Sequence, residues 1–183
     1  MRVVVAGEGM VELSRDGDGW RLGHGGDTLN TAIHLARAGV NTAYLTALGA
    51  DPLSAELRAN WAAEGLDTAL VLTDPARNPG LYAINTDAHG ERSFTYWREA
   101  SAARAMFECE GSAAALDRAG SADLLVFSLI SLAILPAGSR DRLLDLAGRV
   151  RDNGGRVAFD GNYRPRLWSG ADEARLWRDA AIA

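Results

Sequence analysis

Cysteine is almost absent from this chain of 183 residues, and clusters of basic side chains are absent altogether. The single cysteine, Cys109, has no partner for an internal disulfide, which fits a protein of the reducing cytoplasm. Arginine and lysine together number 19 against 24 aspartates and glutamates, so the net charge is −5. Without a basic run or stripe, nucleic acid and anionic membrane surfaces are not expected partners.

Long hydrophobic runs are also missing. The most apolar stretch, residues 124–135, is well short of the roughly 20 residues that a membrane-spanning helix needs. The N-terminal segment reaches Glu8 too soon to form the core of a signal peptide. The three histidines, His24, His34 and His89, do not have the spacing of metal ligands. The sequence therefore predicts a soluble, cytoplasmic protein with no metal site of its own.

What the chain does contain is an alternation of β-strand and α-helix patterns. Short β-branched and apolar runs predict the strands, and amphipathic stretches that end at glycine predict helices between them. This order is typical of an α/β protein with a mainly parallel sheet covered by helices, and we expect about five strands. The expected strands are residues 2–6, 41–48, 69–73, 124–130 and 156–160.

Two segments break this alternation and have the pattern of antiparallel hairpins. Residues 11–22 place apolar side chains on either side of a polar turn at 15–19. The aromatic-rich runs 80–86 and 92–98 flank a predicted loop at 87–90. A hairpin inserted into an α/β alternation usually leaves the main sheet, so we predict a separate flap.

The segment GHGGDTLN joins a glycine turn to the start of a helix. A nucleotide phosphate loop is a poor match, because Asp27 stands where such a loop has lysine. Gly25 and Gly26 instead allow a ligand to approach the backbone closely, while Asp27 and Asn30 can bond the hydroxyls of a sugar. An alternative stays open, in which Asp27 or Thr28 only caps the helix and the glycines only form a turn.

A second cluster follows the predicted strand 156–160. Asn162 and Arg164 come just after this strand, at the carboxyl edge where open α/β sheets bind ligands. The guanidinium group of Arg164 suits a carboxylate or a phosphate. The alternative is structural, with a helix cap and an arginine beside packed Pro165 and Trp168.

A third cluster lies on the predicted flap. Strand alternation places Tyr96 and Arg98 on one face, with Tyr82 on the partner strand, and together they could cover a small acidic sugar. The alternative is that these side chains only form cross-strand pairs that stabilise the hairpin or a dimer contact. Two carboxylates near the first strand, Glu8 and Glu12, have no clear partner in the sequence.

The three clusters, in this order, resemble those of the ribokinase-like (PfkB) carbohydrate kinases, and within that family the 2-keto-3-deoxygluconate kinases. The resemblance implies an α/β fold of the ribokinase type, with a mainly parallel sheet flanked by helices and a small β-sheet lid. Residues 1–183 would form one partial domain of this type, with lid strands within about 11–23 and 80–98. The matching strings are GEGMVEL (7–13), GGDTLNTA (25–32), TALGAD (46–51), GLYAINTDAHGERSFTYWR (80–98), SLISLAIL (128–135) and DGNYRPRLW (160–168).

The resemblance implies an activity, the transfer of the γ-phosphoryl group of ATP to a hydroxyl of 2-keto-3-deoxygluconate with Mg²⁺. Asn162 and Arg164 would lie where substrate and ATP meet, and Arg98 and Arg164 would hold the carboxylate of the sugar acid. Gly161 stands where close relatives commonly carry a larger residue, so we expect a looser turn there. Carried over by position, the substrate-binding residues are Gly25, Gly26, Asp27, Asn30, Tyr82, Tyr96, Arg98, Asn162 and Arg164.

One feature of the family is missing from these 183 residues. The family places its catalytic base in a Gly-Ala-Gly-Asp string far toward the C-terminus, together with most of the nucleotide site, and no such string occurs here. We therefore expect no catalytic residue in this chain, a domain that stops before its C-terminal half, and no phosphoryl transfer by the 183 residues alone.

Two alternative functions remain open from the sequence. The first is a non-catalytic remnant that binds a sugar acid, and the second is a related hexose kinase of the fructose type, which would accept a neutral sugar. In each case the expected partner is a small sugar molecule rather than a nucleic acid or a membrane. A homo-oligomer joined through the lid is compatible with the family.

Overall fold

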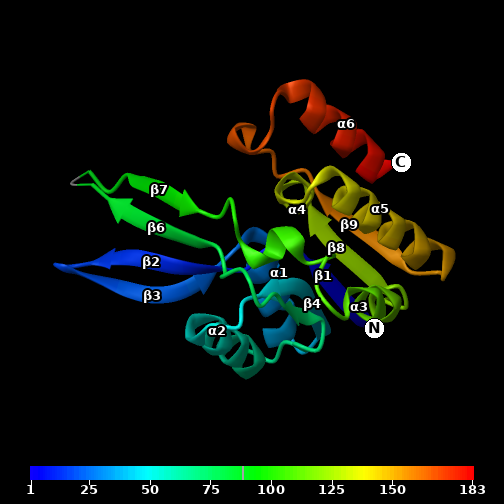
Figure 1. The fold of residues 1–183 in the computed structure, drawn as a ribbon, viewed down its shortest axis with the longest axis horizontal. Coiled ribbons are helices and arrows are strands. Elements are labelled where there is room, and N and C mark those ends of the chain that lie inside the picture. The colour runs from blue at the N-terminus through cyan, green and yellow to red at the C-terminus, as the bar shows by residue number, and fades with distance from the viewer. Residues whose placement is uncertain (88) are drawn as a thin grey trace.

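The computed structural model describes residues 1–87 and 89–183, and its centre is a parallel sheet of five strands (Figure 1). The strands lie in the order β5-β4-β1-β8-β9. The prediction of an α/β protein with a mainly parallel sheet is confirmed. The strand bounds are Arg2–Ala6 (β1), Asn41–Leu48 (β4), Val71–Thr73 (β5), Leu124–Ser128 (β8) and Arg156–Asp160 (β9).

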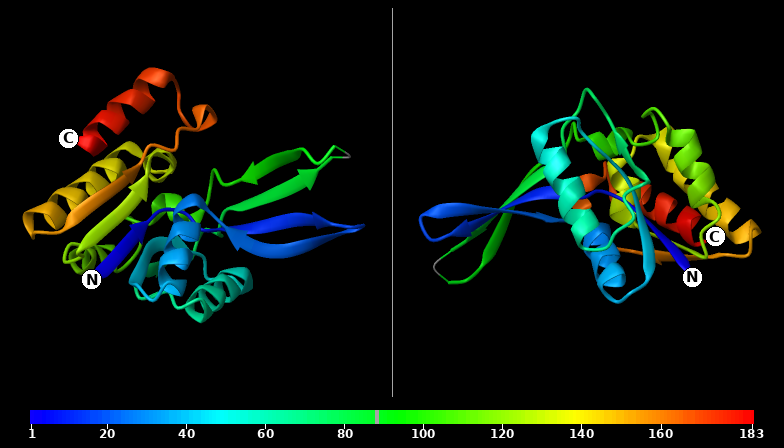
Figure 2. Two further views of the ribbon diagram at one scale, coloured as in Figure 1. Left: turned by 180° about the vertical axis from the view of Figure 1, so that it is seen from behind. Right: turned by 90° about the horizontal axis from the view of Figure 1, so that it is seen from below.

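Helices cover both faces of this sheet (Figure 2). One face carries α1 and α2, and the other carries a short 3₁₀ helix, η1, followed by α3, α4 and α5. The last helix, α6, packs against α4. The helix bounds are Asp27–Arg37 (α1), Pro52–Ala63 (α2), Ala102–Ala105 (η1), Ser112–Ala119 (α3), Leu129–Ile134 (α4), Ala137–Asp152 (α5) and Ala171–Ile182 (α6).

The central strand β1 shows how the sequence builds two cores. Val3 and Val5 belong to the core under α1 and α2, whereas Val4 and Ala6 belong to the core on the opposite face. All four side chains are fully buried. Because a parallel strand in this position is covered on both sides, it is a continuous apolar run rather than an alternation of apolar and polar residues.

A second sheet of four strands extends away from the carboxyl edge of the main sheet (Figure 1). Its order is β3-β2-β6-β7, in which β2 and β6 are parallel and the outer pairs are antiparallel. The predicted hairpins thus leave the main sheet, as expected. The loop predicted at 87–90 includes Ala88, which lies outside the described residues. The strand bounds are Met10–Asp16 (β2), Gly19–Gly25 (β3), Leu81–Thr86 (β6) and Arg92–Trp97 (β7).

Three expectations about the elements are wrong in detail. The strand expected at 69–73 is shorter and comprises only β5. The strand expected to run to residue 130 ends at Ser128, because the Ser128 and Ser131 side chains form a capping box that starts α4. Arg98 lies beyond the end of β7, so strand alternation does not determine where its side chain points.

The helix expected after Asp51-Pro52 is present, and it begins as the sequence predicts. Asp51 caps α2 by accepting a hydrogen bond from the backbone N–H of Ser54, with Oδ1 at 3.0 Å. Across the part of the chain that the structure describes, the helices are all too short or too polar to cross a lipid bilayer.

Candidate functional site

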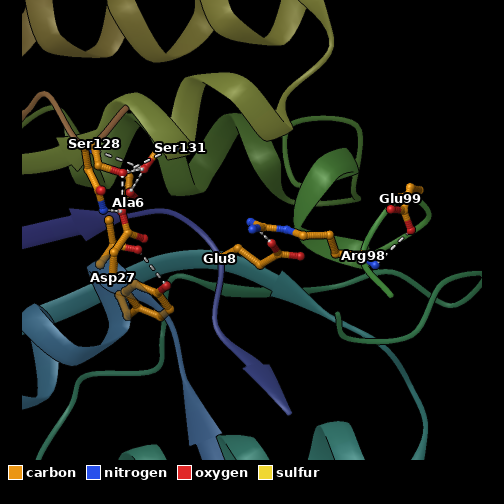
Figure 3. A network of polar contacts seen from close by, with 10 residues as sticks. Ala6, Glu8, Asp27, Arg98, Glu99, Ser128 and Ser131 are labelled. Atoms are coloured by element: carbon orange, nitrogen blue, oxygen red, sulfur yellow. Dashed lines mark hydrogen bonds and ion pairs between the residues drawn. The ribbon is translucent and has the colours of Figure 1, made fainter. Parts of the chain in front are cut away.

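Three polar side chains from distant parts of the chain meet at the carboxyl edge of the main sheet. Asp27 begins α1, Ser128 ends β8, and Asn162 follows β9. The Ser128 hydroxyl donates to Asp27 Oδ2 at 2.6 Å, and the Asn162 amide donates to the same oxygen at 3.3 Å (Figure 3 shows the first pair). The structure therefore brings two of the three sequence clusters together around one carboxylate.

The helix start explains why this carboxylate is available. Gly26 is the N-cap of α1, and the Asp27 side chain makes no capping bond. The alternative in which Asp27 or Thr28 caps the helix is therefore wrong. Gly26 has a φ of +154°, and a Cβ at this position would collide with the carbonyl oxygen of Glu8. The glycine allows the backbone to turn tightly, which frees Asp27 to point toward Ser128.

Ser128 is itself held in place by the strand end beside it. Its Oγ accepts from the backbone N–H of Ser131 at 3.2 Å, and the Ser131 hydroxyl donates to the carbonyl of Ala6 at 2.9 Å. Both serine side chains are buried. This network ties the carboxyl ends of β1 and β8 to the start of α1 and fixes the direction of the Asp27 carboxylate.

A buried ion pair lies near the same edge of the sheet. Glu8 follows β1, Arg98 follows β7, and the Arg98 guanidinium contacts the Glu8 carboxylate (Figure 3). The two residues are 3% and 8% exposed. Burial raises the pKa of Glu8 above its ordinary value, while the positive charge of Arg98 opposes that rise. The expectation that Glu8 has no clear partner is wrong.

Tyr82 pairs with the second carboxylate that the sequence left without a partner. The Tyr82 hydroxyl donates to Glu12, and burial followed by this hydrogen bond raises the pKa of Tyr82 well above its usual range. A Cβ on Gly25 would collide with the Tyr82 hydroxyl, so only glycine leaves room for this pair. The Tyr82 ring lies 5.8 Å from the ring of Tyr96, centroid to centroid. Gly25 and Tyr82 are therefore neighbours at the base of the second sheet.

A cleft of about 640 Å³ opens between β7 and the loop that follows β9. This volume lies within the range of typical small-molecule sites. Three of the sequence-predicted residues, Tyr96, Arg98 and Arg164, line it together. The Arg98 guanidinium lies 5.8 Å from the centre of the Tyr96 ring. The remaining lining residues are Phe94, Thr95, Glu99, Ile130, Pro165, Arg166 and Leu167.

The lining of the cleft has an excess of positive charge. It includes three arginines, Arg98, Arg164 and Arg166, and one glutamate, Glu99. Arg164 is exposed, and its guanidinium donates to the carbonyl of the neighbouring Tyr163 at 3.2 Å. This arrangement suits an anionic ligand, because guanidinium groups bind carboxylates and phosphates through paired hydrogen bonds.

The carboxylate network and the cleft adjoin each other along the chain. Ile130 of the cleft is two residues from Ser128, and Arg164 is two residues from Asn162. Asn30 is exposed on α1, one turn after Asp27. The structure thus joins Asp27 to Asn162 and places Tyr96, Arg98 and Arg164 around one cleft, while Arg98 is already paired with Glu8 and the Tyr82 hydroxyl is already paired with Glu12.

Sequence reasoning missed three contributors to this region: Ser128, Glu8 and Arg166. Ser128 could have been found, because it ends an apolar strand at the same edge as Asn162. Glu8 also follows a strand, but its partner Arg98 comes just after β7, 90 residues later in the sequence, and no local pattern indicates that pairing. Arg166 follows Arg164 in the same loop and lines the same cleft.

The family model described as "pfkB family carbohydrate kinase" matches residues 2–182. The chain belongs to this family. A chain of the pfkB family has the ribokinase-like α/β fold, so the fold class that the sequence resemblance implied is confirmed.

Individual members of the family are similar to this chain over most of its length. A 2-dehydro-3-deoxygluconokinase of Escherichia coli K12 is 46% identical over 178 residues, which cover 95% of this chain and 58% of that protein. The chain thus spans somewhat more than half the length of this relative. The crystal structure of a 2-dehydro-3-deoxygluconokinase from Thermotoga maritima superimposes with a TM-score of 0.79 at 26% identity, over 92% of this chain and 53% of that one.

A second solved structure supports the fold alone. A PfkB family carbohydrate kinase from Listeria grayi superimposes with a TM-score of 0.88 at 22% identity, over 100% of this chain and 58% of that one. Together, the family match and these superpositions show that the chain has the architecture of a sugar kinase.

Proposed function

We propose that this chain supplies the sugar-binding part of an ATP-dependent kinase that acts on 2-keto-3-deoxygluconate. The observation that carries this proposal is the arginine-lined cleft beside the Asp27 carboxylate. The arginines of the cleft suit the carboxylate of a sugar acid, and the Asp27 carboxylate suits its hydroxyl groups. Similarity to 2-dehydro-3-deoxygluconokinases supports the same substrate. The expected place of action is the cytoplasm, where ATP is available.

In this proposal, each side of the site binds a different part of the sugar acid. Ser128 and Asn162 occupy two of the lone-pair positions of the Asp27 carboxylate, which leaves other positions for ligand hydroxyls. Gly25 and Gly26 let the ligand lie against the backbone, and Asn30 adds an amide one turn later on α1. Arg98 and Arg164, which line the cleft, bind the carboxylate.

The second sheet is proposed to act as a lid. It joins the domain next to the cleft, and its strand β7 contributes Tyr96 to the cleft lining. The rings of Tyr96, Tyr82 and Phe94 pack against one another, and this aromatic cluster would contact a bound sugar. A second copy of the chain could meet the exposed side chains of this sheet, since Trp20 and Trp97 are about half exposed.

The residues present fit part of an ATP site. Arg164 is exposed and makes its hydrogen bond only to a neighbouring carbonyl among the described contacts, so it can turn toward a phosphate oxygen. Asn162 lies beside it. ATP would supply the phosphoryl group, and Arg164 would hold it near the sugar. Among the described residues, no cluster of three or more acidic, histidine or cysteine side chains fits Mg²⁺, so we derive no step through the metal.

Titration calorimetry on the 183-residue chain tests the proposal. We expect 2-keto-3-deoxygluconate to bind at least about tenfold more tightly than fructose, because fructose lacks the carboxylate that the arginines bind. Equal affinity, or tighter binding of fructose, would favour a kinase of the fructose type. A coupled assay with ATP and Mg²⁺ should show no turnover by these residues alone, because the aspartate base that the family resemblance implies does not occur in them.

A further inference from the structure

Arg98 lies between a buried carboxylate and the cleft. One Nη of its guanidinium contacts Glu8, and the residue also lines the cleft with Tyr96 and Arg164. Its side chain is only 9% exposed, and within the part of the chain that the structure describes its Nε has no hydrogen-bond partner. Because Nε is itself buried, an anion in the cleft would be bound through an Nη group of this arginine rather than through Nε.

Glu8 is placed rigidly enough to control the direction of that guanidinium. It follows the strand β1, whose residues 3–6 are fully buried, and its backbone carbonyl packs against Gly26. A Cβ on Gly80 would lie only 2.7 Å from Glu8 Oε1, so glycine at that position makes room for the carboxylate. Because a guanidinium group is planar and rigid, holding one nitrogen fixes the direction of the others.

Stability alone gives a weak reason for this pair. Taking two charges out of water costs free energy that their attraction often fails to recover, and an apolar pair can replace such a bridge with little loss. The pair also leaves Glu8 Oε1 and Arg98 Nε without hydrogen bonds among the described residues. An ion pair that costs desolvation free energy, lacks some of its hydrogen bonds and lies next to a cleft is better explained by a role in binding.

We propose that Glu8 is a positioning residue that aims Arg98 at a ligand carboxylate in the cleft, and so sets the preference for an acidic over a neutral sugar. The inference rests on the proposed function, because it takes the cleft to be the sugar-acid site. Without the charge of Glu8, the Arg98 guanidinium can pair instead with Glu99, which lines the same cleft and accepts from the Arg98 backbone N–H at 3.1 Å. Glu99 would then compete with the ligand carboxylate for Arg98.

The variants Glu8→Gln and Glu8→Asp test this role by calorimetry on the 183-residue chain, with 2-keto-3-deoxygluconate and fructose as ligands. Glu8→Gln keeps the shape of the side chain and removes its charge. Glu8→Asp keeps the charge but moves it away from Arg98 by the length of one methylene group. Both should reduce the preference for the acidic sugar by about tenfold, the effect of misdirecting one charged hydrogen bond. Fructose affinity should stay the same. The matched control is Glu56→Gln on the exposed side of α2, which should change neither affinity.

The outcomes separate this inference from the proposed function. If the unaltered chain prefers the acidic sugar and both Glu8 variants keep that preference, Glu8 is structural and the inference is wrong. Equal losses for both sugars, or tighter binding of the acid by Glu8→Gln, also overturn it. If the unaltered chain shows no preference, the proposed function and the inference both fail. If Glu8→Gln does not fold, Glu8→Asp still tests the inference, because it keeps a negative charge as the counter-ion of the buried Arg98.

Discussion

The hydroxyl of Ser128 donates a hydrogen bond to Asp27 Oδ2 at 2.6 Å, although 101 residues separate them in the sequence. The same Oγ accepts from the backbone N–H of Ser131 and so caps α4. One side chain therefore connects the end of β8, the start of α4 and the start of α1. The direction of the Asp27 carboxylate depends on this connection.

Ser128→Ala should lower both stability and sugar affinity. The variant loses a helix cap and the partner of a carboxylate, which together should cost about 1–2 kcal/mol of unfolding free energy. Urea denaturation measures that loss. The matched control is Ser93→Ala on the exposed strand β7, which should stay within about 0.5 kcal/mol of the unaltered chain. Equal stabilities for the two variants would contradict the role given to Ser128.

Arg164→Ala should weaken binding without weakening the fold. The side chain is exposed and bonds only its neighbour's carbonyl among the described contacts, so the free energy of unfolding should change little. Affinity for 2-keto-3-deoxygluconate should fall by about 1.5–3 kcal/mol, the usual value of a charged hydrogen bond. Calorimetry measures the affinity, and Arg151→Ala at the end of α5 serves as the control. Unchanged affinity would show that Arg164 does not bind the sugar acid and has only a structural role.

Gly26→Ala should be strongly destabilising, whereas Gly161→Ala should be nearly neutral. A Cβ on Gly26 would collide with the Glu8 carbonyl, and the φ of +154° is a conformation that L-residues rarely adopt. A Cβ on Gly161 meets no atom within 4 Å. We expect Gly26→Ala to lower the free energy of unfolding by more than about 2 kcal/mol, and Gly161→Ala to lower it by less than about 0.5 kcal/mol. Thermal and urea unfolding of both variants measure the difference, and similar stabilities would refute this account of the turn.

The pair of Arg140 and Glu173 should make stability depend on acid pH. The hydrogen bond from Arg140, with Nη1 at 2.6 Å from Oε1, and the bonds from Ser169 lower the pKa of Glu173 to about 2. Because this pKa lies below the ordinary glutamate value of 4.5, the stabilisation is complete above about pH 4.5 and is lost as pH falls toward 2.

Glu173→Gln provides the test of that dependence. It should lower the free energy of unfolding by about 1 kcal/mol at neutral pH, a modest value because the glutamate is partly exposed. The difference from the unaltered chain should shrink when urea denaturation is repeated near pH 3. A difference that stays constant between the two conditions would show that the charge of Glu173 has no part in it.

Local patterns predicted most of the fold. The strands β1, β4 and β9 have the bounds that their apolar runs predicted, and Asp51 caps α2 as its position before proline indicated. The boundary at Ser128 was missed, because a capping box ended an apolar run that has no glycine or proline in it. Such a boundary depends on hydrogen bonds that hydrophobicity alone does not reveal.

Part of the candidate site was predictable from the sequence, but its pairings were not. The glycine turn before a helix indicated Asp27, the end of a strand indicated Asn162, and the structure brings the two within hydrogen-bond distance. The pairing of Glu8 with Arg98 joins two sheets, and it depends on how the second sheet leaves the first. No spacing in the sequence contains that information, since Arg98 lies beyond the last residue of β7.

A crystal structure of the 183-residue chain with 2-keto-3-deoxygluconate bound tests the central claim most directly. We expect the sugar carboxylate within hydrogen-bond distance of Arg98 and Arg164, with sugar hydroxyls on the Asp27 carboxylate. A ligand bound in that cleft with its carboxylate directed away from both arginines, or bound elsewhere on the chain, would contradict it.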